Sequence, residues 1–265
     1  MHSLKRAVLI LILFFAIAIP AIINAPKQIE KKLEEERQIQ AEKEKRKTYL
    51  LGKFDPALHE DFTVVPLSYS MSQSKMYLRE ESFVAFVKMR EAALQDGVTL
   101  NIASATRNFD YQKELWEKKW KGVTLVEGKR LPESVPDELA RFKKILEYSA
   151  APGTSRHHWG TDIDINGADP AYFNTETGKK VYDWLSKNAR LYGFCQTYTF
   201  KNKERPTGYN EEKWHWSYFP LARIFTEQYV SLVKDEDIGG FLGGEQVKSL
   251  NLINDYVTGI NPECQ

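Results

Sequence analysis

The segment Thr161-Asp162-Ile163-Asp164-Ile165 alternates polar and apolar side chains with the period of a β-strand. Because successive side chains of a strand point to opposite faces, Asp162 and Asp164 share one face and the isoleucines the other. Two carboxylates cannot lie side by side without a partner that compensates their charge. The fold must therefore give this strand one apolar face and one face that stabilises two acids.

Three of the five histidines lie in two short segments, which indicates a metal site. His157 and His158 precede the strand that carries Asp164, and His215 lies in a second segment of alternating polarity. A catalytic zinc site needs about three nitrogen or carboxylate ligands and an open position where the metal lowers the pKa of a bound water. Two histidines and one aspartate would supply these ligands, and composition alone does not choose between the two adjacent histidines.

A carboxylate outside the metal ligands must accept the proton of that water, and two glutamates beside His215 are candidates. In a regular strand Glu211 would share the face of His215, whereas Glu212 would point to the opposite face. We expect the strand to begin only at Lys213, after the turn at residues 208–210, so Glu212 is preferred and Glu211 is the alternative.

Two motifs relate the site to a known family. Residues 155–164 have the spacing Ser-x-His-x-x-Gly-x-x-x-Asp, and residues 212–215 read Glu-x-Trp-His. Both resemble motifs of the D-alanyl-D-alanine carboxypeptidase family of zinc peptidases, to which the vancomycin-resistance carboxypeptidases are related. The resemblance extends over roughly residues 49–218. It implies one zinc ion with the ligands His157, Asp164 and His215, and Glu212 as general base.

A third segment, residues 104–112, resembles the family's element in which an arginine ends a strand and a glutamine follows five residues later. The resemblance implies that Arg107 stabilises the oxyanion formed at the scissile carbonyl, and that Ser155 and Gln112 contact the substrate. On the residues alone, Arg107 could instead form an ion pair with Asp110, and Gln112 could simply pack beside it.

Asp162 departs from the family, which usually has a small residue at this position. It could orient a metal ligand, bind Arg156 or take the metal itself. Zinc also rests on the resemblance, because two imidazoles and a carboxylate would accommodate iron or cobalt.

The pattern of elements predicts an α+β fold. The resemblance specifies this as the Hedgehog/DD-peptidase-like fold, with a small antiparallel sheet that is flanked by helices and carries the zinc site. The predicted helices are Met76–Leu94, Asp110–Trp120, Leu139–Tyr148, Lys180–Tyr192 and Leu221–Val233, and the predicted strands are Val98–Ala103, Thr161–Ile165 and Lys213–Tyr218.

Four regions follow from the composition along the chain. Residues 1–25, with a basic start and an apolar run, are predicted to be a signal peptide or a membrane anchor. Residues 26–48 read as a charged helical spacer, 49–235 as the peptidase domain and 236–265 as a C-terminal tail. We therefore expect an exported protein, periplasmic or extracellular, with residues 7–25 as a possible anchor in the inner membrane.

The two cysteines form no metal or redox motif. Cys195 follows Tyr192-Gly193-Phe194, a setting in which a buried free thiol is the simpler interpretation, and a disulfide with Cys264 is the alternative.

The net charge of +1 offers no basic excess for a nucleic-acid partner. The expected activity is that of a metallocarboxypeptidase, a D,D-carboxypeptidase that removes terminal D-alanine from peptidoglycan stem peptides. The alternatives are an L,D-carboxypeptidase or endopeptidase of the same family, and a non-catalytic, zinc-stabilised module that binds wall peptides or a partner protein. Oligomeric state does not follow from the sequence.

Overall fold

The computed structural model describes residues 27–265, and contacts divide the chain after Arg46 into two units. The described part of the first unit, residues 27–46, is helical and almost entirely exposed. Ion pairs one helical turn apart, such as Lys31 with Glu35, stabilise it locally. The structure thus has a helix over residues 27–46, and the role of this helix as a spacer stays a prediction.

The predicted signal peptide or anchor at residues 1–25 lies outside the described residues. Within residues 27–265, no helix has the length and hydrophobicity that a membrane span requires.

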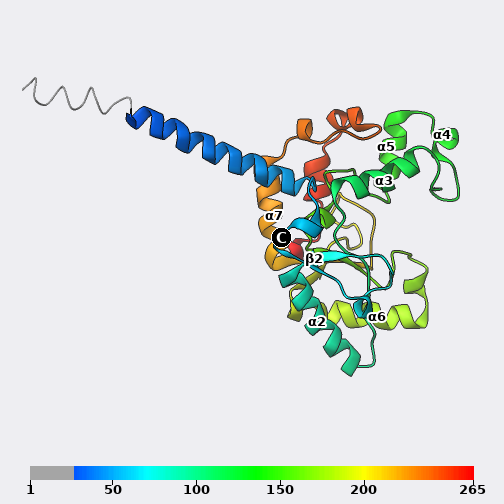
Figure 1. Ribbon diagram of the computed structural model, residues 1–265. Helices are drawn as coiled ribbons and strands as arrows, with labels where there is room; N and C mark the ends of the chain where they lie inside the picture. The colour runs from blue at the N-terminus through cyan, green and yellow to red at the C-terminus, as the bar shows by residue number, and fades with distance from the viewer. Residues whose placement is uncertain (1–26) are drawn as a thin grey trace, which may run out of the picture. The chain divides into compact units, whose positions relative to one another are not determined.

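The second unit, residues 47–265, mixes helices with short strands, as the α+β prediction requires (Figure 1). Its strands are β1 (Phe62–Val64), β2 (Tyr77–Arg79), β3 (Ile102–Ser104), β4 (Asp162–Ile165), β5 (Phe194–Gln196) and β6 (His215–Tyr218). Its α-helices are α2 (Glu80–Gln95), α3 (Phe109–Trp120), α4 (Leu131–Ser134), α5 (Glu138–Leu146), α6 (Glu176–Asn188) and α7 (Phe219–Leu232).

Four strands form the central antiparallel sheet in the order β3-β4-β6-β5, and β1 pairs with β2 in a separate two-stranded sheet. Strand β4 lies in the middle of the larger sheet, where Asp162 pairs with Ser217 and Asp164 pairs with His215. This register brings the second acid of β4 directly opposite the histidine of β6.

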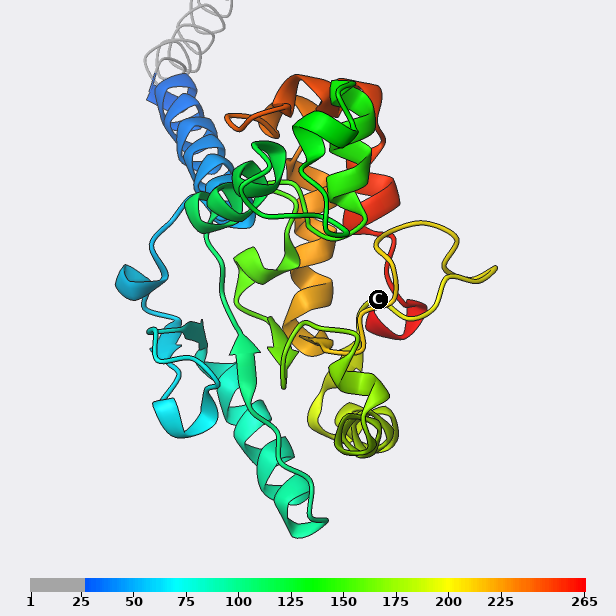
Figure 2. The ribbon, with the colours of Figure 1, turned by 90° about the vertical axis from the view of Figure 1, so that its right-hand side faces the viewer.

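The two faces of this sheet differ as the alternation in β4 predicts. Ile163 and Ile165 pack into an apolar core with residues of α2 and α6. The opposite face carries Asp162 and Asp164, beyond which a second core contains residues of α3, α5, α7 and the C-terminal segment. In Figure 2, α2 and α6 lie below the strands and α3 and α5 above them. The acids therefore lie between two cores.

The helices over residues 109–120, 138–146 and 219–232 agree closely with those expected. The helix predicted from Met76 begins only at Glu80, because Tyr77–Arg79 form strand β2 against β1. Strands β1 and β5 are likewise absent from the predicted elements. All three are three-residue strands, too short for an alternating pattern to be recognised in the sequence.

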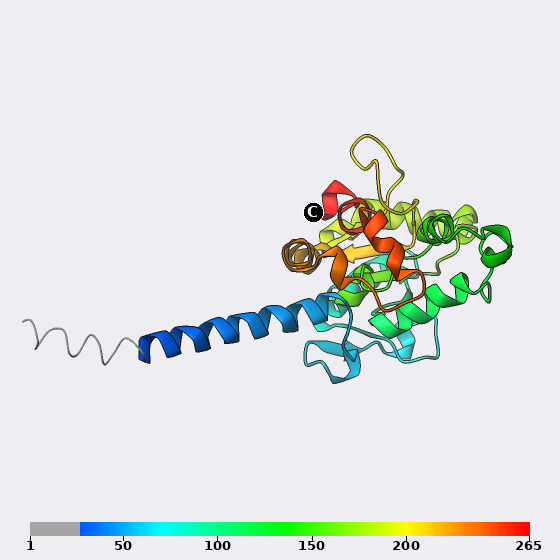
Figure 3. The same ribbon diagram turned by 90° about the horizontal axis from the view of Figure 1, so that it is seen from above.

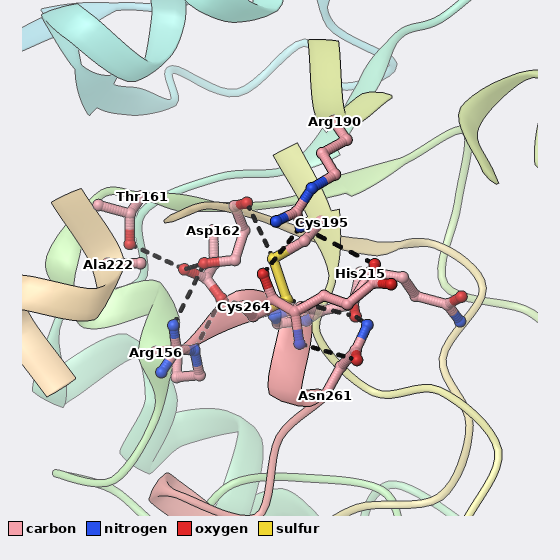
Figure 4. Close-up of a disulfide and its surroundings, with 12 residues drawn as sticks. Arg156, Thr161, Asp162, Arg190, Cys195, His215, Ala222, Asn261 and Cys264 are labelled. Carbon is pink, nitrogen blue, oxygen red and sulfur yellow. Dashed lines mark hydrogen bonds and ion pairs between the residues drawn. A yellow bond between two sulfur atoms is a disulfide. The ribbon is translucent and has the colours of Figure 1, made fainter. Parts of the chain in front are cut away.

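The free thiol expected at Cys195 is wrong, because Cys195 on β5 forms a disulfide with Cys264 across a sequence separation of 69 residues (Figure 4). Asn261 strengthens the same connection: its backbone N–H donates to Thr197 O at 2.9 Å and its side chain to Gln196 O at 3.0 Å. The partner of Cys195 could not be inferred from its neighbours in sequence. The segment that contains Cys264 lies beside β5 only in the folded protein.

Candidate active site

Three buried side chains converge at the polar face of the sheet. Asp164 Oδ1 lies 3.4 Å from His157 Nε2 and 3.3 Å from His215 Nδ1. Asp164 and His215 come from the paired strands β4 and β6, and His157 comes from the 3₁₀ turn Arg156–Trp159 that precedes β4. One ligand atom of each residue lies within 4.8 Å of the other two, so the group could hold one metal ion.

In each of the two histidines, one ring nitrogen is hydrogen-bonded to the protein, and this determines which nitrogen is free to bind a metal. His157 Nδ1 lies 2.8 Å from the carbonyl of Ala105, and His215 Nε2 lies 2.9 Å from Asp162 Oδ2. A ring nitrogen that donates its proton to such an acceptor leaves the other nitrogen with a lone pair for a metal. The free atoms are therefore His157 Nε2 and His215 Nδ1, the two that face Asp164.

Asp162 does not belong to the converging group but supports it (Figure 4). Its Oδ2 contacts both His215 and the guanidinium of Arg156, at 2.9 and 3.2 Å, while its Oδ1 accepts hydrogen bonds from Thr161 and Ser217. Burial alone would raise the pKa of Asp162, but Arg156 and then His215 outweigh burial and lower it. Two of the roles considered for Asp162, orienting His215 and pairing with Arg156, are thus both observed.

The charges around the free ligand atoms suit a cation. Burial alone would lower the pKa of His215, but the nearby carboxylates of Asp162, Asp164 and Glu212 raise it well above its usual value. His157 Nε2 and Asp164 Oδ1 are also buried without a hydrogen-bond partner. Buried polar atoms are normally paired, so these two atoms fit a metal ion as their missing partner.

His158, the competitor of His157, has both ring nitrogens occupied by the backbone. Its Nδ1 lies 2.6 Å from Arg107 O, and its Nε2 accepts a hydrogen bond from the Gly153 N–H at 3.0 Å. Burial lowers the pKa of His158 to about 3, which keeps the ring neutral. This histidine connects three loops and has no nitrogen left for a metal.

Glu212 lies beside the converging group and lines the same pocket, with Oε2 3.3 Å from His215 Nδ1. Strand β6 begins at His215, so Glu212 precedes it and strand alternation does not apply. Its backbone N–H donates to Tyr198 O at 2.9 Å, which holds the residue at the edge of the sheet. Glu211 does not line the pocket.

Arg107 and Ser155 also line this pocket, a cavity of about 110 Å³. Arg107 follows strand β3 at a distance of three residues, and its backbone N–H donates to His157 O at 3.2 Å. Its Nε is buried without a hydrogen-bond partner, and among residues 27–265 no ion pair joins Arg107 to Asp110. The guanidinium is therefore available to a ligand in the pocket.

Gln112 lies behind the pocket wall instead of in it. Its side chain is buried on α3 and donates to the carbonyl of Ala150 at 2.8 Å, and Ala150 lines the pocket. In this structure Gln112 positions a wall residue and does not itself face the cavity.

No sequence pattern indicates the tyrosines that form much of the remaining wall. Tyr148, Tyr198 and Tyr209 line the pocket together with Trp214. Tyr198 and Tyr209 lie on the long connection between β5 and β6, which stands out from the body as the yellow loop in Figures 2 and 3. Tyrosines are common in cores, and no spacing marks these as wall residues.

A family model described as VanY, D-alanyl-D-alanine carboxypeptidase, matches residues 75–221, more than half of the chain. The chain belongs to this family. The match contains Arg107 and both motifs that line the pocket, and it ends before the C-terminal segment that carries Cys264.

Two curated relatives agree with this assignment. The YodJ protein of Bacillus subtilis (strain 168), named as a candidate carboxypeptidase, is 32% identical over 201 residues, or 72% of this chain and 62% of its own. A D-alanyl-D-alanine carboxypeptidase of Enterococcus faecalis is 34% identical over 133 residues, or 48% of this chain and 43% of its own. The chain thus spans less than two thirds of the length of these relatives.

Two solved structures are similar to this chain. The LdcB LD-carboxypeptidase shares 26% identity with a TM-score of 0.48, over 69% of this chain and 81% of its own. VanYB in complex with D-alanine-D-alanine shares 26% identity with a TM-score of 0.42, over 65% of this chain and 94% of its own.

Proposed function

We propose that this protein is a zinc-dependent D,D-carboxypeptidase that hydrolyses the terminal D-Ala-D-Ala bond of peptidoglycan stem peptides. One observation carries the proposal: three free ligand atoms, of His157, Asp164 and His215, converge in a pocket that Glu212 and Arg107 also line. Membership of the carboxypeptidase family supports the substrate class.

His157 Nε2, Asp164 Oδ1 and His215 Nδ1 would hold the ion, and two imidazoles with one carboxylate are a ligand set of catalytic zinc sites. When bound there, zinc polarises the scissile carbonyl and lowers the pKa of a water molecule. Asp162 keeps the ring of His215 in the tautomer that offers Nδ1.

Glu212 accepts the proton of the attacking water on its carboxylate and passes it to the leaving amine of D-alanine. Arg107 faces the developing oxyanion, and its guanidinium, whose Nε is buried without a partner, stabilises that charge, an effect of about 3 kcal/mol for a fixed donor. Ser155 contacts the bound peptide from the floor of the pocket.

The test uses the full chain loaded with zinc and three synthetic substrates: a stem pentapeptide, a stem tetrapeptide and a cross-linked dimer. We expect loss of one D-alanine from the pentapeptide, detected by mass spectrometry, and no loss after removal of the metal by a chelator. Re-addition of zinc should restore the activity.

Other outcomes would identify the alternatives. Cleavage of the tetrapeptide alone would indicate an L,D-carboxypeptidase, and cleavage of the cross-linked dimer alone an endopeptidase. Binding of the peptides without cleavage by folded, zinc-loaded protein would indicate a wall-peptide binding module.

We also propose that the protein is exported. The disulfide between Cys195 and Cys264 supports this, because such bonds persist in oxidising compartments. In cells that make the full chain, thiol alkylation before lysis should leave both cysteines unmodified, and fractionation should recover the protein outside the cytoplasm. A cytoplasmic protein with both cysteines alkylated would contradict export.

A further inference from the structure

Unpartnered polar atoms concentrate at the pocket. Within the described residues, ten buried side-chain nitrogen or oxygen atoms lack a hydrogen-bond partner, and four of them belong to residues that line this cavity. These four atoms are Arg107 Nε, His157 Nε2, Asp164 Oδ1 and the hydroxyl of Tyr209. The proposed function uses the first three residues and leaves Tyr209 without a role.

The hydroxyl of Tyr209 can serve only as an uncharged group. Burial raises the pKa of Tyr209, so the hydroxyl keeps its proton. The nearby hydroxyl of Thr154 opposes this rise of the pKa, as a weak hydrogen-bond partner would. Its contact with Tyr209 does not reach the geometry of a hydrogen bond, and its own proton goes to Ala151 O at 2.8 Å. Since a buried hydroxyl without a partner destabilises the folded protein, its retention at a pocket wall points to a ligand as the missing acceptor.

The ring of Tyr209 packs against two other tyrosines. Its centroid lies 5.0 Å from that of Tyr198 and 5.1 Å from that of Tyr256, and its carbonyl accepts a hydrogen bond from Arg205 at 2.9 Å. Tyr256 belongs to the C-terminal segment, beyond the residues that the family model matches. The hydroxyl is thus positioned before any substrate binds.

We propose that Tyr209 is a further catalytic residue, whose hydroxyl donates a hydrogen bond to an oxygen atom of the bound peptide. The proposal rests on the carboxypeptidase function. It assigns the C-terminal segment a role as well, because Tyr256 packs against the ring that carries this hydroxyl.

The test is Tyr209→Phe in the full, zinc-loaded chain, with the stem pentapeptide as substrate. We expect kcat/KM to fall about tenfold or more, as for loss of a buried hydrogen bond. The midpoint of thermal unfolding should stay the same or rise, because the hydroxyl that is removed has no partner in the free protein. A purely structural role would predict the opposite: lower stability and unchanged kinetics.

Tyr256→Phe is the matched control, since it removes a hydroxyl from the neighbouring ring, which does not line the pocket. It should leave kcat/KM unchanged. Equal kcat/KM in wild type and Tyr209→Phe, or a fall that accompanies an equal loss in Tyr256→Phe, would overturn the assignment.

A binding measurement separates this inference from the proposed function. If the wild type binds the pentapeptide without cleaving it, the proposed function fails, and weaker binding by Tyr209→Phe, measured by calorimetry, would still support the hydrogen bond. Unchanged affinity would overturn it. If the wild type neither binds nor cleaves any of the three peptides, both proposals are wrong.

Discussion

The pocket has a sheet side and a loop side, and the two are held in different ways. On the sheet side, Asp164 and His215 are directly paired on neighbouring strands, and Asp162 fixes the ring of His215. On the loop side, residues 197–212 carry Tyr198, Tyr209 and Glu212 without a strand of their own.

Long-range contacts replace a strand partner on the loop side. The buried guanidinium of Arg205 donates to the carbonyls of Thr207 and Tyr209 within the loop, and to Gly259 in the C-terminal segment. A Cβ at Gly208 would lie 2.1 Å from Gly259 O, so only glycine allows the two segments to approach this closely. The disulfide joins the same segment to β5.

From this difference we infer that metal binding and the placement of substrate-contacting groups depend on separate sets of contacts. Damage to the sheet side should lower metal affinity, whereas damage to the loop side should lower turnover or stability with the metal still bound. Three predictions test this division, and a fourth concerns the buried histidine behind the pocket.

The largest effect is expected from Glu212→Gln, which removes the proton acceptor from the loop side. We expect kcat/KM on the pentapeptide to fall by about a thousandfold, within the usual range for a general base. Zinc content and the midpoint of thermal unfolding should not change. Glu211→Gln is the matched control and should retain activity, and the reverse pattern would identify Glu211 as the base.

Reduction of the Cys195–Cys264 disulfide should lower the free energy of unfolding by about 4 kcal/mol, the chain-entropy effect for a loop of this length. Urea denaturation with and without dithiothreitol measures it, and a Cys195→Ala/Cys264→Ala variant should not respond to the reductant. Zinc affinity should be the same in both redox states. A parallel loss of zinc affinity would show that the two sides are not independent.

Asp162→Asn should damage the sheet side, because it leaves the buried Arg156 without a charged partner and weakens the contact with His215. We expect the free energy of unfolding to fall by about 3 kcal/mol. The zinc affinity should fall by roughly tenfold to hundredfold. Competition with a chelator measures the affinity. Asp183→Asn, at an exposed position of α6, should change neither quantity.

The effect that is smallest near neutral pH concerns His158, and it grows as the pH is lowered. Its pKa is about 3 in the folded state against 6.5 as the usual value, so below pH 6.5 the unfolded chain binds a proton that the folded chain does not. Between these values stability should fall by up to about 1.4 kcal/mol per pH unit through this group as the pH is lowered.

Urea denaturation of metal-free wild type and His158→Gln between pH 4 and 8 tests this, as the slope of stability against pH should differ by about one proton below pH 6.5 and not at all above it. Equal slopes below pH 6.5 would mean that His158 is not held neutral.

The sequence predicted much of the sheet side because its signals are local. The alternation over residues 161–165 gave β4 and its acidic face, and the two motifs brought together His157, Asp164 and His215, which the structure finds converging. Local spacing could not show that the histidine following His157 is bound at both nitrogens by the backbone of residues 107 and 153.

The α+β class, the acidic strand and the metal-binding candidates could be predicted from the sequence, because each rests on short motifs or local periodicity. The role of Asp162, the disulfide and the tyrosine wall of the pocket became visible only in the folded structure. Asp162 contacts His215 at a separation of 53 residues, and Cys195 pairs with Cys264 at a separation of 69 residues. Such contacts form only when the whole chain packs, since no local pattern records which distant segment will supply the partner.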